Sequence, residues 1–451
     1  MLVKKNDKLI YYIILFHAQV QEVSRHIQTM SIEILPREII ANILTYTEKT
    51  SELLNFGITC KDFNYIIKEY KDIFNSVTII RGGNKLKADI IGKIDLSIKS
   101  LNEISSIDIE KLKYIVNFYM YDYNLEDTEN ILDRLVNVKN VEINKCHYIY
   151  KIPEFINLIK IDMSNCINLT DISNLSKSTK LKYLILDACI NLKDISVLEN
   201  LNNLEYVSIK HCNLIEELKY LRKVKRINIS GSGIKKIEGL GDELIELTID
   251  EISNFIEDIS ELDKCINLET LNLCYCNNLR DISVVSKLHK LKKLDISGTY
   301  LLDYNVIDKC KNLEELIVSH NDYIYKLGDL EFKINKINLR GCENLEDISN
   351  LINVNELDLT LCESLSDIST LGKSKCLKKL SISRCEEIYD INGIEECQTL
   401  EYIDLSGCVY IKDISPLLKI KNLKYVNLKF CKYVKDTDID LLKNLGIELY
   451  Y

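Results

Sequence analysis

The chain has 451 residues, of which 46% are hydrophobic, three are proline and fifteen are glycine. This composition excludes collagen-like, proline-rich and wholly disordered chains, because enough apolar surface is present to offset the entropy lost on folding. A net charge of −10 at pH 7 argues against duplex nucleic acid, since phosphate recognition needs an excess of Lys and Arg. A protein partner is favoured, and sixteen cysteines remain to be explained.

Residues 1–30 form an N-terminal extension. Three lysines, at positions 4, 5 and 8, precede an apolar run from Leu9 to Phe16, which loosely resembles a signal peptide. The run is far shorter than the roughly 20 residues that span a bilayer. We expect the extension to be dispensable, with Met30 as the functional start.

Residues 31–75 are predicted to form three short helices. Pro36 suits the first position of a helix, where its missing N–H costs nothing. Apolar residues at 39, 40, 43 and 44 share one face of that helix, and the apolar groups within 53–56 and 63–67 suit two more. A domain of about forty residues has a marginal core, so some of its apolar side chains are expected to meet a partner.

This helical segment resembles an F-box. The shared features are an opening Leu-Pro at 35–36, a helix that ends Ile-Leu at 43–44, and a later Cys-Lys at 60–61 followed by an aromatic residue. The resemblance implies docking on a Skp-family adaptor of a cullin ubiquitin ligase. The alternative is that the helices only cap the exposed core of the first repeat. The residues that the resemblance assigns to the adaptor are Leu35, Pro36, Ile39, Ile43, Leu44 and Leu53.

A sequence repeat occupies residues 91–451, after a glycine turn at 82–83 that we interpret as part of a linker and first-repeat cap over 76–90. The segment from Leu181 to Ser196 shows the unit, L-x-x-L-x-L-x-x-C-x-x-L. Its period of 20 to 24 residues predicts about sixteen stacked units. The recurring cysteines are Cys146, Cys166, Cys189, Cys212, Cys276, Cys342, Cys362, Cys385, Cys408 and Cys431, and Ser232, Ile252, Thr299 and Asn321 take that place elsewhere.

Each unit is predicted to contain a strand followed by turns. The Leu-x-Leu segment alternates with period two, so stacked units build a parallel sheet with about 4.8 Å between strands. The cysteine follows where the chain turns inward, and its thiol is a compact apolar group with a weak donor. An Asp-Ile-Ser motif then predicts a short helical or 3₁₀ turn. That motif begins at Asp171, Asp194, Asp258, Asp281, Asp347, Asp367 and Asp413.

The repeat resembles the cysteine-containing subtype of leucine-rich repeats over about four fifths of the chain. The spacing from Cys265 to Asp281, repeated from Cys397 to Asp413, carries this resemblance, while the Asp-Ile-Ser-x-Leu motif is similar to shorter bacterial and regulatory subtypes. The resemblance implies an α/β solenoid with parallel strands on its concave face and short helical or 3₁₀ turns on its convex face. Abundant Ile, Asn and Lys favour an AT-rich genome, such as that of an amoeba or its large DNA virus.

The residues between the leucines are expected to project from the concave face and to bind a substrate protein. Tyr183 is expected to stack beside Tyr206 in the next unit, and Tyr402 beside Tyr425, because exposed aromatic residues commonly anchor interfaces. The alternative is that these residues reflect only the β propensity of Tyr in a Tyr-rich chain. The candidate set is Tyr183, Tyr206, Tyr275, Tyr402, Tyr425 and Phe430.

No pattern of catalytic or metal-ligating residues is found in the sequence. Cys274 and Cys276 are close, but the repeat points one outward and the other inward, so they cannot share a zinc ion. The six histidines include no i, i+4 pair, and Cys60 has no residue in its helix to activate it. We therefore predict no enzymatic activity, cofactor or metal, and neither a membrane nor a nucleic acid as partner.

The F-box resemblance and the repeats together favour a non-catalytic substrate receptor of an SCF-type ubiquitin ligase. The F-box would dock on the Skp-family adaptor, and the concave face would bring a target protein close to the ligase. Buried cysteines gain nothing from an oxidising compartment, which favours the cytoplasm or nucleus, and the host cytoplasm for a viral protein. The alternative is a stand-alone repeat scaffold or effector whose N-terminal helices only cap the solenoid.

Overall fold

The computed structural model describes residues 77–78, 94–98, 115–121, 132–219, 221–250, 255–301 and 303–451. The helices predicted for 31–75 lie outside the described residues, as do the six candidate adaptor-binding residues, Cys60 and Ile252. The chain divides into two compact units, Met1–Ile143 and Asn144–Tyr451.

The described residues of the first unit include three parallel strands. β1 (Val77–Thr78) pairs with β2 (Ile94–Ile98), and β2 pairs with β3 (Ile115–Tyr121). Phe118 and Met120 of β3 are both buried, as expected for a strand with one face in the core. β4 (Asn140–Asn144) lies at the boundary between the two units.

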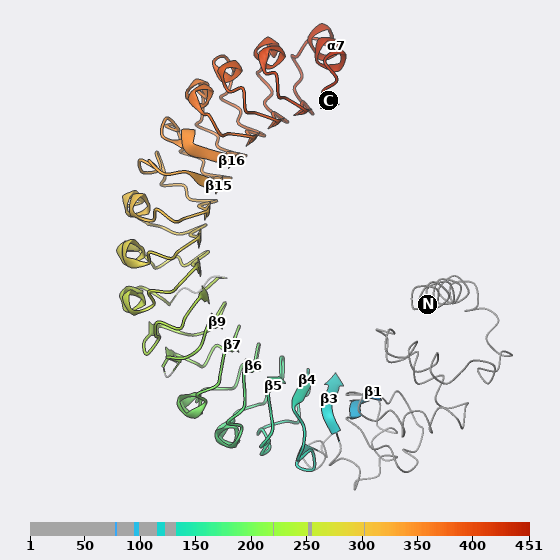
Figure 1. The fold of residues 1–451 in the computed structure, drawn as a ribbon, viewed down its shortest axis with the longest axis vertical. Helices are drawn as coiled ribbons and strands as arrows, with labels where there is room; N and C mark the ends of the chain where they lie inside the picture. Colours follow the sequence, from blue (N-terminus) through green and yellow to red (C-terminus); the bar gives the residue numbers. More distant parts are fainter. Residues whose placement is uncertain are drawn as a thin grey trace, which may run out of the picture. The chain divides into compact units, whose positions relative to one another are not determined.

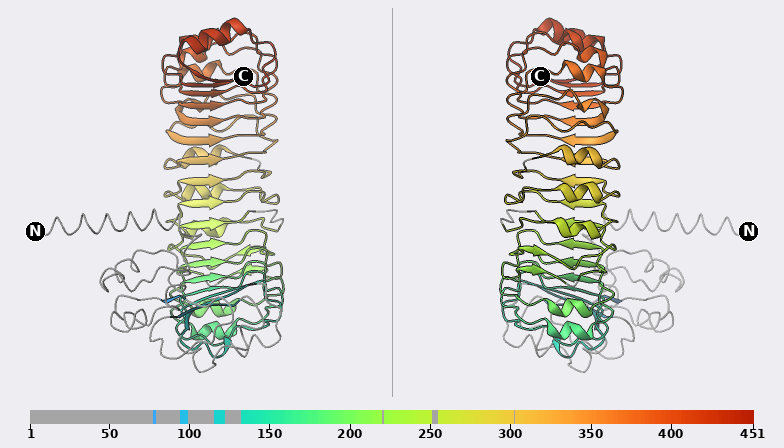
Figure 2. Two further views of the ribbon diagram at one scale, coloured as in Figure 1. Left: turned by 90° about the vertical axis from the view of Figure 1, so that its right-hand side faces the viewer. Right: turned by 90° about the vertical axis from the view of Figure 1, so that its left-hand side faces the viewer.

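The second unit is a series of repeats whose strands pair in parallel and in register (Figures 1 and 2). Figure 1 shows these strands on the inner side of the arc that this unit follows. The predicted solenoid of parallel strands is thus confirmed. The strands are β5 (Lys160–Asp162), β6 (Tyr183–Ile185), β7 (Tyr206–Ser208), β9 (Arg226–Asn228), β11 (Glu246–Thr248), β12 (Thr270–Asn272), β13 (Lys293–Asp295), β14 (Glu315–Ile317), β15 (Ile334–Asn338), β16 (Val354–Asp358), β17 (Lys379–Ser381), β18 (Tyr402–Asp404), β19 (Tyr425–Asn427) and β20 (Glu448–Tyr450).

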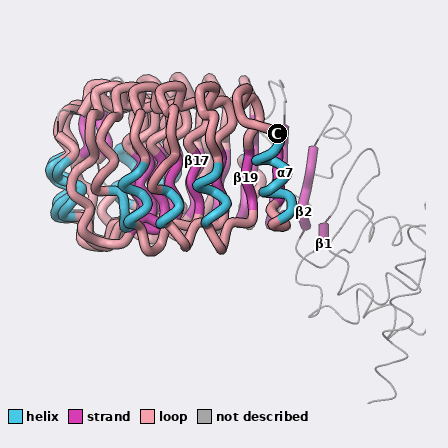
Figure 3. Tube along the Cα trace, turned by 90° about the horizontal axis from the view of Figure 1, so that it is seen from above, coloured by secondary structure: helices cyan, strands magenta, loops and turns pink. Residues whose placement is uncertain are grey.

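Short helices lie on the outer, convex side of the same unit, as Figures 1 and 3 show. Two repeats between η4 and η5 carry a separate strand pair instead, β8 (Glu217–Leu218) with β10 (Lys236–Ile237). The 3₁₀ helices are η3 (Ser173–Lys177), η4 (Ser196–Asn200), η5 (Ser260–Lys264), η6 (Ser283–Lys287), η7 (Asn305–Lys309), η8 (Leu351–Asn353), η9 (Ser369–Lys373), η10 (Ile394–Glu396) and η11 (Ser415–Lys419), and one α-helix, α7 (Asp436–Asn444), follows them.

The Asp-Ile-Ser motif begins these convex turns, as predicted. Asp171 accepts a hydrogen bond from the backbone N–H of Ser173 at 2.8 Å, and the other six motifs repeat this contact at 2.6 to 2.8 Å. The hydrogen bonds from Ser173 lower the pKa of Asp171 to about 2. The aspartate thus satisfies an N–H that the turn leaves without a backbone partner.

The recurring cysteines fill the core beside the strands. Every described cysteine is a free thiol, and those of the repeat slot are buried except for Cys431, which is half-buried. From Cys189 onward, each slot thiol donates to a backbone carbonyl of the preceding repeat at 2.9 to 3.2 Å. Asn321 fills the same slot and donates to the carbonyls of Ile296 and Val318. A thiol suits this slot because it is a small group that can be buried and can still donate a hydrogen bond.

Candidate binding surface on the concave sheet

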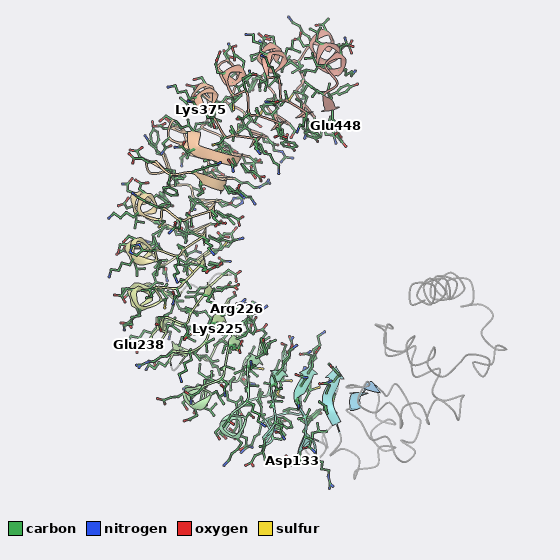
Figure 4. All side chains as sticks on the ribbon, in the orientation of Figure 1. Asp133, Lys225, Arg226, Glu238, Lys375 and Glu448 are labelled. Carbon is green, nitrogen blue, oxygen red and sulfur yellow. The ribbon has the colours of Figure 1, made fainter. Side chains whose placement is uncertain are left out.

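The outward side chains of the strands form columns across the sheet, because parallel register keeps equivalent residues side by side. Figure 4 shows Arg226 and Glu448, both first residues of strands, on the inner side of the arc, and Glu238 on the outer side. The first column is Lys160, Tyr183, Tyr206, Arg226, Glu246, Thr270, Lys293, Glu315, Lys336, Glu356, Lys379, Tyr402, Tyr425 and Glu448.

Opposite charges neutralise the middle of this first column. Glu315 lies 2.9 Å from Lys293 and 3.2 Å from Lys336, through its two carboxylate oxygens. Arg226 pairs with Glu246 at 3.8 Å, and Lys379 pairs with Glu356 at 2.7 Å. Exposed pairs of this kind contribute little stability. Their effect on binding is that the middle of the sheet presents little net charge to a partner.

A stack of three tyrosines lies at the C-terminal end of the sheet. The ring centroids of Tyr402 and Tyr425 are 4.5 Å apart at an interplanar angle of 6°, and Tyr450 follows at 5.4 Å and 39°. The ammonium group of Lys429 lies 5.2 Å from the centroid of the Tyr450 ring. Burial, and then the charge of Asp404, raise the pKa of Tyr402 to about 12.

Tyr183 and Tyr206 behave differently at the other end of the sheet. They are also paired in register, and 38% of Tyr183 is exposed. The rings of Tyr402 and Tyr425 stack on each other. Among the described residues, the rings of Tyr183 and Tyr206 are not in stacking contact. Of the two predicted tyrosine pairs, the structure brings together only the second.

Two candidate residues lie in turns and not between the leucines of the strands. Tyr275 and Phe430 have φ angles of +57° and +66° and come directly before the cysteine slot. They are exposed by 42% and 72% and occupy the last x position of the L-x-x-L-x-L-x-x unit, after its final leucine. The sequence did contain a signal for this turn. The same position is glycine in other repeats, and glycine is the residue that most easily adopts positive φ.

A second column of polar residues ends the strands. The carboxylate of Asp358 accepts from the backbone N–H of Thr360 at 2.9 Å, and Asp404 accepts from Ser406 at 2.8 Å. A second oxygen of Asp404 accepts from the side-chain amide of Asn427 at 3.1 Å. These carboxylates therefore fix the turns that follow the strands.

The convex side carries a hollow of about 460 Å³ where β8 and β10 replace the 3₁₀ helices. Its lining includes Arg222, Lys223 and Glu238, but Glu238 pairs with Lys236 at 2.9 Å and Lys223 donates to the amide oxygen of Asn202. The hollow thus contains locally compensated polar groups and no converging set of reactive side chains.

The thiols of Cys274 and Cys276 are unsuited to chemistry at this surface. Cys274 is half-buried and Cys276 is buried, and burial, followed by the charge of Asp295, raises the pKa of Cys274 to about 12. In the described ranges, no three His, Cys, Asp or Glu side chains are grouped so that they could hold a metal ion. The helices in those ranges are all too short or too polar to cross a bilayer.

Comparisons with known proteins identify the fold. No family model and no curated protein matches the sequence. A solved structure of TLR13 with ssRNA13 matches with a TM-score of 0.54 and 16% identity, over 75% of this chain and 58% of that one. An internalin from Listeria monocytogenes matches at TM-score 0.37 and 20% identity, over 76% and 82% of the two chains. A leucine-rich-repeat protein of Leptospira interrogans matches at TM-score 0.38 and 16% identity, over 80% and 89%.

The second unit is a leucine-rich-repeat solenoid. Its parallel strands, 3₁₀ turns and buried repeat positions agree with the structural similarity to TLR13. At such low identity the similarity concerns the fold alone, because one repeat fold serves many unrelated functions.

Proposed function

We propose that this protein is a non-catalytic interaction module whose concave leucine-rich-repeat sheet binds a target protein. The observation that supports this most directly is the stack of Tyr402, Tyr425 and Tyr450 at the C-terminal end of the sheet. Large, partly exposed aromatic groups are typical anchors of protein interfaces. Rings that already pack on one another lose little conformational entropy when a partner binds.

The surroundings of the stack favour a protein as the partner. The phenol hydroxyls of the stack can donate and accept hydrogen bonds. The first column neutralises its own charges toward the middle of the sheet. Specificity would therefore come from aromatic contact and directed hydrogen bonds more than from net charge.

The test is a selection of binders from a displayed library of protein fragments, with the full chain as bait. Tyr402→Ala/Tyr425→Ala should weaken the selected binders at least about 30-fold, the effect of removing an interface anchor worth about 2 kcal/mol. Tyr389→Ala/Tyr410→Ala is the matched control, because these rings also stack, at 5.2 Å and 26°, but follow the cysteine slot and lie outside the concave strands. Failure to select any binder, or equal loss in both variants, would contradict the proposal.

A second candidate adds a ubiquitin ligase to this function. It rests on the F-box-like pattern at 35–36, 43–44 and 60–61 and makes the protein an SCF-type substrate receptor in the cytoplasm or nucleus. Co-purification of the full chain with a Skp-family adaptor tests it. Retention of the adaptor that is lost in Leu35→Ala/Pro36→Ala supports the receptor. If the adaptor is not retained, or is retained equally by the variant, the stand-alone scaffold is favoured.

A further inference from the structure

Unusual backbone geometry is concentrated at one position of the repeat. Within the described residues, every non-glycine residue with positive φ directly precedes the cysteine slot. Positive φ is uncommon for non-glycine residues and is a genuine outlier for bulky ones, so it persists only where the surrounding structure enforces it. These residues are Lys145, Asn165, Ala188, His211, Tyr275, His320, Leu361, Arg384 and Phe430.

The hydrogen bonds of the sheet enforce this backbone. The N–H of His320 donates to the carbonyl of Arg340 in the next repeat, and the N–H of Arg384 donates to that of Ser406, both at 2.8 Å. Each of these residues from Lys145 to Arg384 is thus the last rung of the parallel ladder before the chain turns into the core. The turn itself requires positive φ, but it does not require a large side chain, because glycine occupies the same position at Gly298 and Gly407.

Several of the large side chains at this position lie against glycines of the following repeat. A Cβ atom on Gly298 would lie 2.3 Å from Cδ1 of Tyr275, and one on Gly341 would lie 2.5 Å from Nδ1 of His320. A Cβ atom on Gly407 would lie 2.8 Å from Cγ of Arg384. The absence of a side chain in one repeat therefore gives space to the side chain of the repeat before it, which is held across the surface instead of extending freely into solvent.

Together with two neighbouring cations, these side chains form a ridge along the edge where the strands end. We call it the turn ridge, and all of its members are exposed. The two cations are Arg340, which immediately precedes Gly341, and Lys429, which immediately precedes Phe430. The ridge places three cations, Arg340, Arg384 and Lys429, between aromatic groups in a chain whose net charge is −10. Its members are Tyr275, His320, Arg340, Arg384, Lys429 and Phe430.

The two arginines of the ridge are available to a ligand. Neither guanidinium forms an ion pair in the described part of the chain, whereas Arg226 in the first column pairs with Glu246. The carboxylates of Asp358 and Asp404 in the second column direct oxygens to backbone or amide N–H groups and form no ion pair with these arginines in the described part of the chain. An unpaired guanidinium offers five N–H donors in a planar fork that fits a carboxylate.

We propose that the turn ridge binds an extended acidic segment of the target protein. This inference rests on the proposed function and names the chemistry of that target. Arg340, Arg384 and Phe430 follow β15, β17 and β19, so they are about 10 Å apart, the span of about three residues in an extended chain. Carboxylates three residues apart would pair with the two arginines, and an apolar side chain three residues further on would contact Phe430. The expected pattern is acidic-x-x-acidic-x-x-apolar, in either direction.

The test uses two labelled synthetic peptides, Glu-Ala-Ser-Glu-Ala-Ser-Phe and its counterpart with Lys in place of Glu, and the full chain. The acidic peptide should bind and the basic one should not. Arg340→Glu/Arg384→Glu should weaken the acidic peptide at least tenfold, and Phe430→Ala should weaken it severalfold. Lys309→Glu/Lys375→Glu makes the same change in charge at two exposed positions outside the sheet and should leave binding unchanged.

Four results would overturn this inference. The first is the absence of binding by the acidic peptide, and the second is equal loss in the two charge-reversal variants. The third is stronger, arginine-dependent binding of a thirteen-nucleotide uridine RNA, which would make the ridge a nucleic-acid site. If fragments selected through Tyr402 and Tyr425 retain full affinity for Arg340→Glu/Arg384→Glu, the ridge is refuted while the proposed function stands. If no fragment is selected, the proposed function itself fails.

Discussion

The two tyrosine pairs of the concave sheet have the same residues and the same register but different structures. Tyr402 and Tyr425 stack in parallel, while Tyr183 and Tyr206 are only adjacent in the ladder. The strand that follows each pair differs. Tyr425 is followed by a strand whose Tyr450 extends the stack, whereas Tyr206 is followed by Arg226, which turns to Glu246. Adjacent tyrosines on this sheet therefore stack where the following strand adds a third ring.

The largest expected effect is a difference in target affinity between alanine substitutions of the two tyrosine pairs. Tyr402→Ala/Tyr425→Ala should lower the affinity for a selected target at least about 30-fold, because it removes a packed aromatic anchor. Tyr183→Ala/Tyr206→Ala should lower it less than about threefold, as expected for residues outside the energetic centre of an interface. Isothermal titration calorimetry with the same fragment measures both. Equal losses would mean that the stack has no special role.

The next largest effect is expected from alanine substitution of the glycines that lie against the turn ridge, measured as a loss in the free energy of unfolding. Gly298→Ala places a Cβ atom against the Tyr275 ring at positive φ, and we expect a loss of about 1–3 kcal/mol in the free energy of unfolding. Gly407→Ala should cost less, because its Cβ atom would meet the flexible side chain of Arg384 at 2.8 Å. Urea titration followed by circular dichroism measures the difference. A larger loss at Gly407 would contradict the described packing of the ridge.

The buried cysteines should not distinguish the two ends of the sheet. Cys189 and Cys385 donate to carbonyls at 3.2 and 3.0 Å, and both are fully buried. Replacement of either by Ala should cost about 1–2 kcal/mol, from one weak hydrogen bond and a small cavity. Similar losses of unfolding free energy for the two variants in urea titrations would show that the cores at the two ends of the sheet are alike. The two ends would then differ only at the surface. A loss confined to Cys385→Ala would place the difference between the ends in the core.

The smallest expected effect is the response of the convex caps to acid. Hydrogen bonds from Ser173 hold the pKa of Asp171 at about 2, and those from Ser415 lower the pKa of Asp413. Because the folded-state pKa lies below the unfolded value near 3.8, this stabilisation is complete above pH 4 and is lost as the pH falls toward 2. The melting temperature of Asp171→Asn should therefore change less than that of the unaltered chain between pH 5 and 2. If the melting temperatures of the two proteins fall in parallel with pH, the Asp171 cap does not contribute to stability.

The sequence predicted the features that depend on spacing. The 20- to 24-residue period placed the strands, the cysteine slot and the Asp-Ile-Ser turns, since each follows from alternation or from a capping side chain. It did not predict the sign of φ at Tyr275 and Phe430, because bulky residues seldom adopt positive φ. At Tyr275 the chain enforces it through a hydrogen bond to the next repeat. Glycine in the same slot at Gly298 and Gly407 was the available signal.

The sequence also could not predict which side chains stack or pair with one another. Tyr-Tyr adjacency is identical at the two ends of the sheet, and the choice between them depends on Tyr450 and Arg226 in the following strands. The replacement of convex 3₁₀ helices by β8 and β10 coincides with repeats that lack the Asp-Ile-Ser motif. That feature could have been predicted from the missing cap.

The most direct test of the central claim is site-specific photocrosslinking of the full chain to a selected target fragment. p-Benzoylphenylalanine is placed at Tyr425 in one sample and at Tyr206 in another, since both are first residues of strands and differ only in the stack beside them. We expect a crosslinked product from position 425 and little or none from position 206. Efficient crosslinking at 206 with none at 425 would contradict the claim that the C-terminal end of the concave sheet binds the target.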